Sequence, residues 1–203
     1  FAARDPEIAE MAGAKRKTAI ARLVEDDPTM FADYQRELRV ADGVSHFIRK
    51  SGRFPLCGRG DVNTYALFAE HNWHIMGPRG RAGFIVPSGI ATDDTTKQFF
   101  SGLIRSQRLV SLYSLYEVRN WFPATDDRKP FCLITLGQQS AAQLAFDARA
   151  IEDLHSPEKR YVLSHADFAL LNPNTLTLPT FRSRADADLT KKIYARAPVM
   201  IRE

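Results

Sequence analysis

The side chains that could carry chemistry are few and scattered. His71 and His74 stand three residues apart, which would place both imidazoles on one helix face, but no third metal ligand is placed to complete a site. Asp93 and Asp94 offer adjacent carboxyl groups, yet their position before an apolar helical pattern is more typical of capping than of acid–base catalysis. We therefore predict no metal site and no catalytic residue within the chain.

The two cysteines add no further chemistry. Cys57 and Cys132 occur in different settings and form no CxxC pair, so the sequence suggests neither a disulfide framework nor a zinc site. We expect both thiols to be reduced.

Charge and hydrophobicity set loose limits on the function. Lys and Arg number 28 against 24 Asp and Glu, a net charge of +4 that permits contact with phosphate without requiring it. No stretch approaches the roughly 20 apolar residues of a membrane span, and no signal-peptide pattern is present. We expect no membrane partner and a cytoplasmic location.

The chain starts at Phe1 and stops directly after the apolar run 199–201, so we expect both ends to continue into a longer polypeptide.

The first fifty residues are predicted to be helical. Asp5-Pro6 and Asp27-Pro28 each place an N-cap residue before a proline at the first helical position. Apolar residues then recur at spacings of three and four, which predicts an amphipathic surface helix: Phe31, Tyr34, Leu38, Ala41 and Val44.

Residues 51–148 alternate between helix and strand patterns. A helix over 62–76 is expected to stop at Gly77-Pro78, with the glycine as a left-handed cap, and another helix is expected to start at Thr92 with acids in its first turn. The order helix, strand, helix, strand, loop, strand predicts an α/β sheet with helices on its faces.

Three apolar runs predict the strands of this sheet. The run 84–87 is continuously apolar, which favours a central strand covered on both faces. Strands over 109–116 and 131–136 have only a polar loop between them, a pattern typical of an antiparallel hairpin at a sheet edge. Residues 142–148 are a candidate extension of the sheet. Beyond residue 153 the pattern is irregular up to a last helix near 185–195.

Three longer segments carry a resemblance to a known family. They are GRGDVNTYALFAEHNWHIMGPRGRAGFIVPSGIATDDTTKQFF from Gly58 to Phe100, NWFPATDDRKPFCLITLG from Asn120 to Gly137, and FALLNPNTLTLPTFRSRADADLTKKIY from Phe168 to Tyr194. In this order they resemble the second half of the catalytic domain of adenine-N6 DNA methyltransferases, particularly those of the fused restriction-modification type.

The resemblance implies a fold, a domain order and partners. The fold is a partial S-adenosylmethionine-dependent methyltransferase sheet, Rossmann-like and α/β, with an N-terminal helical segment. Residues 1–50 are that segment, residues 51–148 the second half of the α/β domain, and residues 149–203 the connection towards a target-recognition domain. The implied partners are double-stranded DNA, the rest of the parent polypeptide and, through an unpaired sheet edge, a second copy of the chain.

Two motifs of that family are absent from this sequence. One is the Gly-containing loop that holds S-adenosylmethionine, and the other is the Asn/Asp-Pro-Pro-aromatic motif that holds the adenine amino group. Asn172-Pro173-Asn174 does not supply the second, because it lacks the second proline and the aromatic residue. The resemblance thus implies a parent enzyme that uses S-adenosylmethionine and a chain that is inactive alone.

Residues at two parts of the site follow from the resemblance. Phe122 and Phe131 are implied as stacking residues at the target base, although Phe131 begins an apolar strand and also fits the core. Asp61, Asn63 and Tyr65 are implied beside the adenine end of the cofactor, although Asp61 also fits an N-cap and Tyr65 the core.

Arginines are the expected contacts to DNA, because phosphate contacts dominate the affinity of proteins for nucleic acids. The best candidates are Arg128, which lies in the loop between the two phenylalanines, and Arg182 and Arg184 in the connection.

The sequence leaves three functions open, of which a methyltransferase that acts on RNA or protein is the weakest, because the connection resembles one that leads to target recognition. The first is a fragment of a site-specific DNA adenine-N6 methyltransferase of a restriction-modification system, which contributes the target-base pocket and a DNA-side surface. The alternative is a non-catalytic DNA-binding or assembly module on a methyltransferase framework. An Asn-Pro-Pro-aromatic motif upstream of Phe1 would favour the enzyme.

Overall fold

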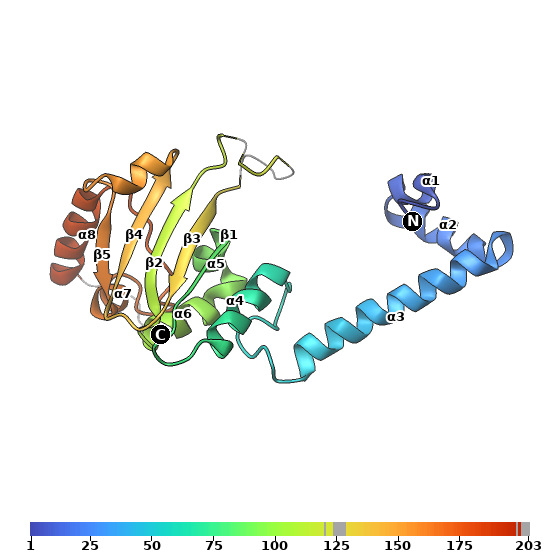
Figure 1. Cartoon of the computed structure of the whole chain (residues 1–203), viewed down its shortest axis with the longest axis horizontal. Coiled ribbons are helices and arrows are strands. Elements are labelled where there is room, and N and C mark those ends of the chain that lie inside the picture. The colour runs from blue at the N-terminus through green and yellow to red at the C-terminus, as the bar shows by residue number, and fades with distance from the viewer. Residues whose placement is uncertain (120, 124–128, 198, 200–203) are drawn as a thin grey trace. The chain divides into compact units, whose positions relative to one another are not determined.

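The structure, a computed structural model, describes residues 1–119, 121–123, 129–197 and 199. Two compact units divide the chain, Phe1–Arg53 and Phe54–Glu203, and each has its own core. The elements of both are shown in Figure 1.

The first unit contains α1 (Pro6–Glu10), α2 (Gly13–Asp26) and α3 (Pro28–Lys50). The two predicted caps are confirmed. The carboxyl group of Asp5 accepts a hydrogen bond from the Ile8 N–H, and that of Asp27 accepts one from the Met30 N–H, each at 2.9 Å. Together with Leu23, these two apolar residues form a small core.

The apolar stripe of α3 is buried only near its start. Phe31 packs against the core of the unit, whereas Leu38 is 45% and Val44 52% exposed. The helix is therefore amphipathic and lies at the surface, as its spacing predicts.

The second unit is built on a mixed five-stranded sheet of order β1-β3-β2-β4-β5. Its strands are β1 (Ala82–Pro87), β2 (Leu109–Leu115), β3 (Phe131–Leu136), β4 (Ala141–Ala148) and β5 (Tyr161–Ser164). Strand β3 is antiparallel to both β1 and β2, β4 is parallel to β2, and β5 is antiparallel to β4. Thus β1, β2 and β4 run in the same direction, and the predicted α/β class is confirmed.

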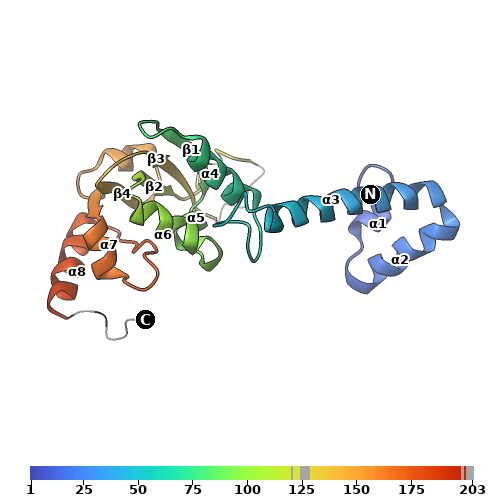
Figure 2. The same ribbon diagram turned by 90° about the horizontal axis from the view of Figure 1, so that it is seen from below.

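Helices cover one face of this sheet. They are α4 (Thr64–Ile75), α5 (Gly89–Thr92), α6 (Lys97–Arg105), α7 (His165–Leu171) and α8 (Arg184–Arg196), with a 3₁₀ turn at Asp94–Thr96. A second 3₁₀ turn, Ile151–His155, follows β4, and its Leu154 packs in a separate cluster with Leu115 and Ala145. Figure 2 shows α5, α6 and α7 along the same face. Fully buried Phe99 and Phe100 of α6 meet Trp73 and Phe168 edge-on, with ring centroids 5.9 and 6.2 Å apart.

The run 84–87 lies in an edge strand, which corrects the predicted central position. Among the strands that the structure describes, β1 pairs with β3 alone, and Ile85 is 53% exposed while Val86 is buried. The β2–β3 hairpin folds back so that β3 lies between β1 and β2, and the hairpin is not at the sheet edge as predicted. Local hydrophobicity did not reveal this order because it depends on pairing between distant segments.

Several predicted boundaries are also corrected. Asp93 ends α5 instead of starting a helix, and α6 begins only at Lys97. Met76 in an extended conformation is the C-cap of α4, so Gly77 forms no left-handed cap. The stretch predicted to be irregular contains β5 and α7, whereas β4 and α8 occur as predicted.

Candidate functional site

The carboxyl ends of β1, β2 and β4 meet at one end of the sheet. Phe131, at the start of β3, pairs with both Pro87 and Leu115, and Leu115 also pairs with Ala148. In open α/β sheets this is the end at which ligands bind, because loops that leave the strands line a crevice there. A ligand site is therefore expected at this end of the sheet.

A cleft of about 270 Å³ opens at this end, between β1 and the segment that joins β2 to β3. Glu117 and Lys129 contribute the charged groups of its lining. The rest of the lining is apolar: Ile85, Val86, Pro87, Phe122, Pro130 and Phe131. Three larger hollows lie on the helices of the first unit, but no predicted site residue lines them.

The two residues predicted at a target base come together in this cleft. The rings of Phe122 and Phe131 have centroids 5.2 Å apart and planes at 86°, an edge-to-face contact. Phe131 is half-buried, packs on a core cluster that includes Leu115 and Leu154, and makes a second edge contact with Trp121 at 5.7 Å. Phe122 is 37% exposed. The core thus holds the Phe131 ring, while Phe122 offers more of its ring to the surroundings.

Glu117 lines the cleft but was not identified from the sequence. Its side chain is buried, and its Oε1 accepts a hydrogen bond from the Trp121 backbone N–H at 2.6 Å. No described residue donates a hydrogen bond to its Oε2. The available sequence signal was an acidic residue soon after a predicted strand, at the end where ligands bind.

The three residues predicted on the cofactor side lie at the start of α4, and none of them lines the cleft. Asn63 is the N-cap residue, although its side chain makes no capping bond, so Asp61, which is exposed, is not the cap. Tyr65 is half-buried. Burial raises the pKa of Tyr65, and the nearby Asp93 and two thiols add to the rise.

The three arginines predicted to contact DNA differ in their surroundings. Arg182 is exposed, and its Nε lies 3.2 Å from Oδ2 of Asp147, close to the carboxyl end of β4. Arg184 begins α8 and lies 3.7 Å from Asp188. Arg128 lies outside the described residues. Arg182 is therefore at the same end of the sheet as the cleft.

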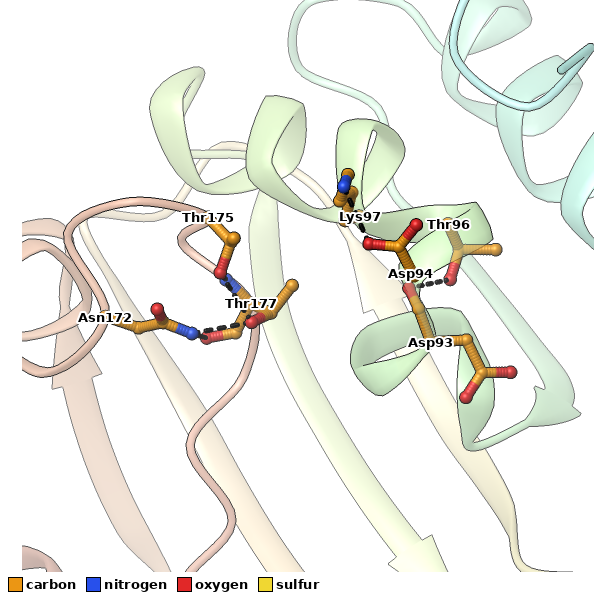
Figure 3. Close-up of polar contacts among 7 residues, drawn as sticks. All are labelled: Asp93, Asp94, Thr96, Lys97, Asn172, Thr175 and Thr177. Atoms are coloured by element: carbon orange, nitrogen blue, oxygen red, sulfur yellow. Dashed lines mark hydrogen bonds and ion pairs between the residues drawn. The ribbon is translucent and has the colours of Figure 1, made fainter. Parts of the chain in front are cut away.

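The remaining polar motifs have structural roles, as Figure 3 shows. The Asn172 side-chain amide donates to Oγ1 of Thr177 at 2.6 Å and closes the turn after α7. Asp94 forms a surface ion pair of 2.6 Å with Lys97. The Thr96 hydroxyl donates to the Asp93 carbonyl at 3.2 Å. Each of these contacts lies within a single turn, and the residues drawn form no cluster of reactive groups.

The described residues contain no group of three or more His, Cys, Asp and Glu side chains arranged to hold a metal ion. Within the same residues, no helix has both the length and the apolar character needed to cross a membrane.

Comparisons with known proteins give distant structural likeness. No family model and no curated protein sequence matches the chain. The methyltransferase subunit of a type I restriction-modification system from Streptococcus thermophilus is similar at 15% identity and a TM-score of 0.47, over 66% of this chain and 34% of that one. A second similar structure concerns the complex assembly and conformational transition of the type I restriction-modification system. It matches at 14% identity and a TM-score of 0.45, over 72% of this chain. The chain spans 34% and 40% of the lengths of these proteins.

Proposed function

We propose that this chain forms the target-base side of an S-adenosylmethionine-dependent DNA adenine-N6 methyltransferase of the restriction-modification type. The observation that supports this function best is the cleft at the carboxyl ends of the strands, in which Phe122 and Phe131 lie in contact. These are the aromatic residues that the sequence resemblance assigns to the target base.

The cleft suits a base that has left the DNA duplex. An adenine inside the duplex is out of reach of a methyl donor, so an enzyme must flip the base out of the stack. The flipped base loses its neighbours, and an aromatic side chain restores about 1–3 kcal/mol by stacking. At about 270 Å³ the cleft is slightly smaller than ordinary small-ligand pockets, which start near 300 Å³. This size suits a single small group.

S-adenosylmethionine would supply the methyl group when bound. The described residues fit an accessory contact to it: Asp61 is exposed, and the Asn63 amide makes no capping bond, so both have polar atoms available to a cofactor. The Gly-containing loop expected from the resemblance does not occur in this sequence. In this chain, Asp61, Asn63 and Tyr65 would therefore only flank the cofactor.

Arg182 is the best-placed candidate for a phosphate contact. Its side chain is 88% exposed, and its guanidinium group lies beside Asp147 at the cleft end of the sheet. A DNA phosphate could replace Asp147 as its partner, because arginine binds carboxylates and phosphates with the same planar array of donors. Arg184 and Arg128 are proposed as further contacts.

Expression of the full-length protein in a host without adenine methylation tests the proposed function. We expect sequencing to detect N6-methyladenine at a defined DNA sequence. Phe122→Ala should lower the methylation rate about 5- to 150-fold, because the flipped base loses its stacking partner. Val118→Ala is the matched control, since Val118 is exposed and does not line the cleft. A full-length protein that binds duplex DNA but leaves it unmethylated would support the non-catalytic alternative.

A further inference from the structure

The carboxyl group of Glu117 is buried but accepts fewer hydrogen bonds than a buried carboxyl group normally does. The side chain is 3% exposed, and among the described residues it accepts one hydrogen bond, from the Trp121 N–H to Oε1. Oε2 has no donor there, and no described cation lies within ion-pair distance. Buried carboxyl oxygens without a donor are costly, so native proteins rarely keep one unless it has another purpose.

The surroundings of Glu117 indicate what the missing donor belongs to. The residue lines the cleft together with Phe122, Phe131 and Pro87, whose side chains are flat and apolar. Flat apolar walls favour a planar ring, while an isolated carboxyl oxygen favours a ring that carries an N–H donor. Enzymes that act on flipped bases combine the same two contacts, stacking on the ring and hydrogen bonds to its edge.

We infer that Glu117 accepts a hydrogen bond from the exocyclic amino group of an adenine ring bound in this cleft. The inference rests on the proposed function for the choice of adenine among amino-bearing rings. Oε1 keeps its hydrogen bond from the Trp121 N–H, which fixes the orientation of the carboxyl group. Oε2 then accepts the hydrogen bond from the amino group. Glu117 is thus a specificity residue for the ligand, next to the stacking residue Phe122.

Two nucleosides that differ only in the amino group provide the test. Adenosine carries the amino group, whereas purine riboside has the same ring without it. The 203-residue chain is titrated with each nucleoside, and backbone NMR shifts are followed at Phe122, Phe131 and Glu117. We expect adenosine to bind about tenfold more tightly, because the hydrogen bond from the amino group to Oε2 is lost with purine riboside.

Glu117→Gln is the decisive variant, because it keeps the side-chain volume and an acceptor for the Trp121 N–H. It places an amide donor where Oε2 was, so the preference for adenosine should fall to parity or reverse. Glu152→Gln, at an exposed position away from the cleft, is the matched control and should keep the wild-type preference. The NMR spectrum of each free variant reports whether it is folded.

Three results would overturn the inference. Equal affinity of the wild-type cleft for both nucleosides would show that the base stacks there without a hydrogen bond to Glu117. No shifts at cleft residues up to the solubility limit of adenosine would show that the cleft does not take the base. Tighter binding of methylguanidinium than of adenosine would assign the cleft to an arginine side chain. None of these results depends on methylation by the full-length protein, so the two proposals can fail separately.

Discussion

At the scale of single residues, the structure gives the two phenylalanines of the cleft different surroundings. Phe131 belongs to β3 and packs on a core cluster, whereas Phe122 lies in the segment before it and is more exposed. The first residue is therefore expected to serve the fold and the second the ligand, although both line the same cleft.

Alanine substitutions should show this division in the free energy of unfolding. Phe131→Ala should cost about 3 kcal/mol, at the lower end for phenylalanine in a core because the residue is only half-buried. Phe122→Ala should cost about 1 kcal/mol, mainly through the lost edge-to-face contact. Urea denaturation measures both. If Phe122→Ala proves the more damaging change, the roles given to the two rings are reversed.

The thiol of Cys132 should make stability depend on pH in the alkaline range. Burial raises the pKa of Cys132 from 9.0 to about 12, and a hydrogen bond with Ser88 opposes part of that rise. Because the folded pKa is the higher one, the stabilisation is complete below the pKa of the unfolded thiol and is lost as pH rises towards 12. The urea midpoint should therefore fall between pH 9 and the high end of the accessible range. The urea midpoint of Cys132→Ala should fall less steeply over the same pH range. Parallel midpoint curves for the two proteins would show that the Cys132 thiol does not cause the loss of stability.

At the scale of elements, the buried Glu70 of α4 forms hydrogen bonds with the loop that precedes this helix. Both carboxyl oxygens of Glu70 accept hydrogen bonds from backbone N–H groups, from Leu56 at 3.0 Å and from Cys57 at 2.8 Å. The side chain is completely buried. This arrangement fixes the path of the chain into the helix whose start carries the proposed cofactor-side residues.

Glu70→Gln should destabilise the second unit by about 1–3 kcal/mol, because one backbone N–H would face an amide donor in place of an oxygen. Thermal or urea unfolding, monitored by near-ultraviolet circular dichroism, measures this loss. Glu152→Gln makes the same change at an exposed position and should alter stability by less than about 0.5 kcal/mol. Similar stability of the two variants would mean that the paired backbone contacts contribute little.

The edge position of β1 should appear in its amide hydrogen exchange. An edge strand bonds its neighbour through alternate residues, so the N–H groups in between have no partner in the sheet. Alternate amides of β1 should exchange fast while the amides of β2, which has strands on both sides, stay protected. Exchange followed by NMR tests this expectation. Uniform protection along β1 would mean that another segment or a second copy covers its outer edge.

At the scale of the whole molecule, the chain holds one side of a proposed site and lacks the motifs expected to complete it. The cleft, the stacking residue and Glu117 lie in the second unit, whereas the Gly-containing loop and the Asn-Pro-Pro-aromatic motif do not occur in the sequence. Alignment of the methyl donor with the target nitrogen requires both parts together.

The isolated chain should therefore bind S-adenosylmethionine poorly and should methylate no DNA. Isothermal titration calorimetry measures the first property, and transfer of a labelled methyl group to duplex DNA measures the second. The full-length protein is the positive control for both. Micromolar affinity of the isolated chain for the cofactor, or methyl transfer by it, would contradict the division of the site proposed here.

Features decided by neighbouring residues were predictable from the sequence alone. The caps at Asp5 and Asp27 and the strands near 109–116 and 131–136 follow from local geometry and from the alternation of apolar residues, so they were predicted correctly. The α/β class follows from the order of such elements. The candidate site was predictable only in part, through the family resemblance of the segment around Phe122.

Only the tertiary structure decided how these elements are arranged. The sequence did not show that β3 lies between β1 and β2, because strand order depends on which distant segments pair. That order brings Pro87, Phe131 and the segment after β2 to one end of the sheet and so forms the cleft. The unpartnered oxygen of Glu117 was equally hidden, since a residue's type says nothing of whether its neighbours in space supply a donor.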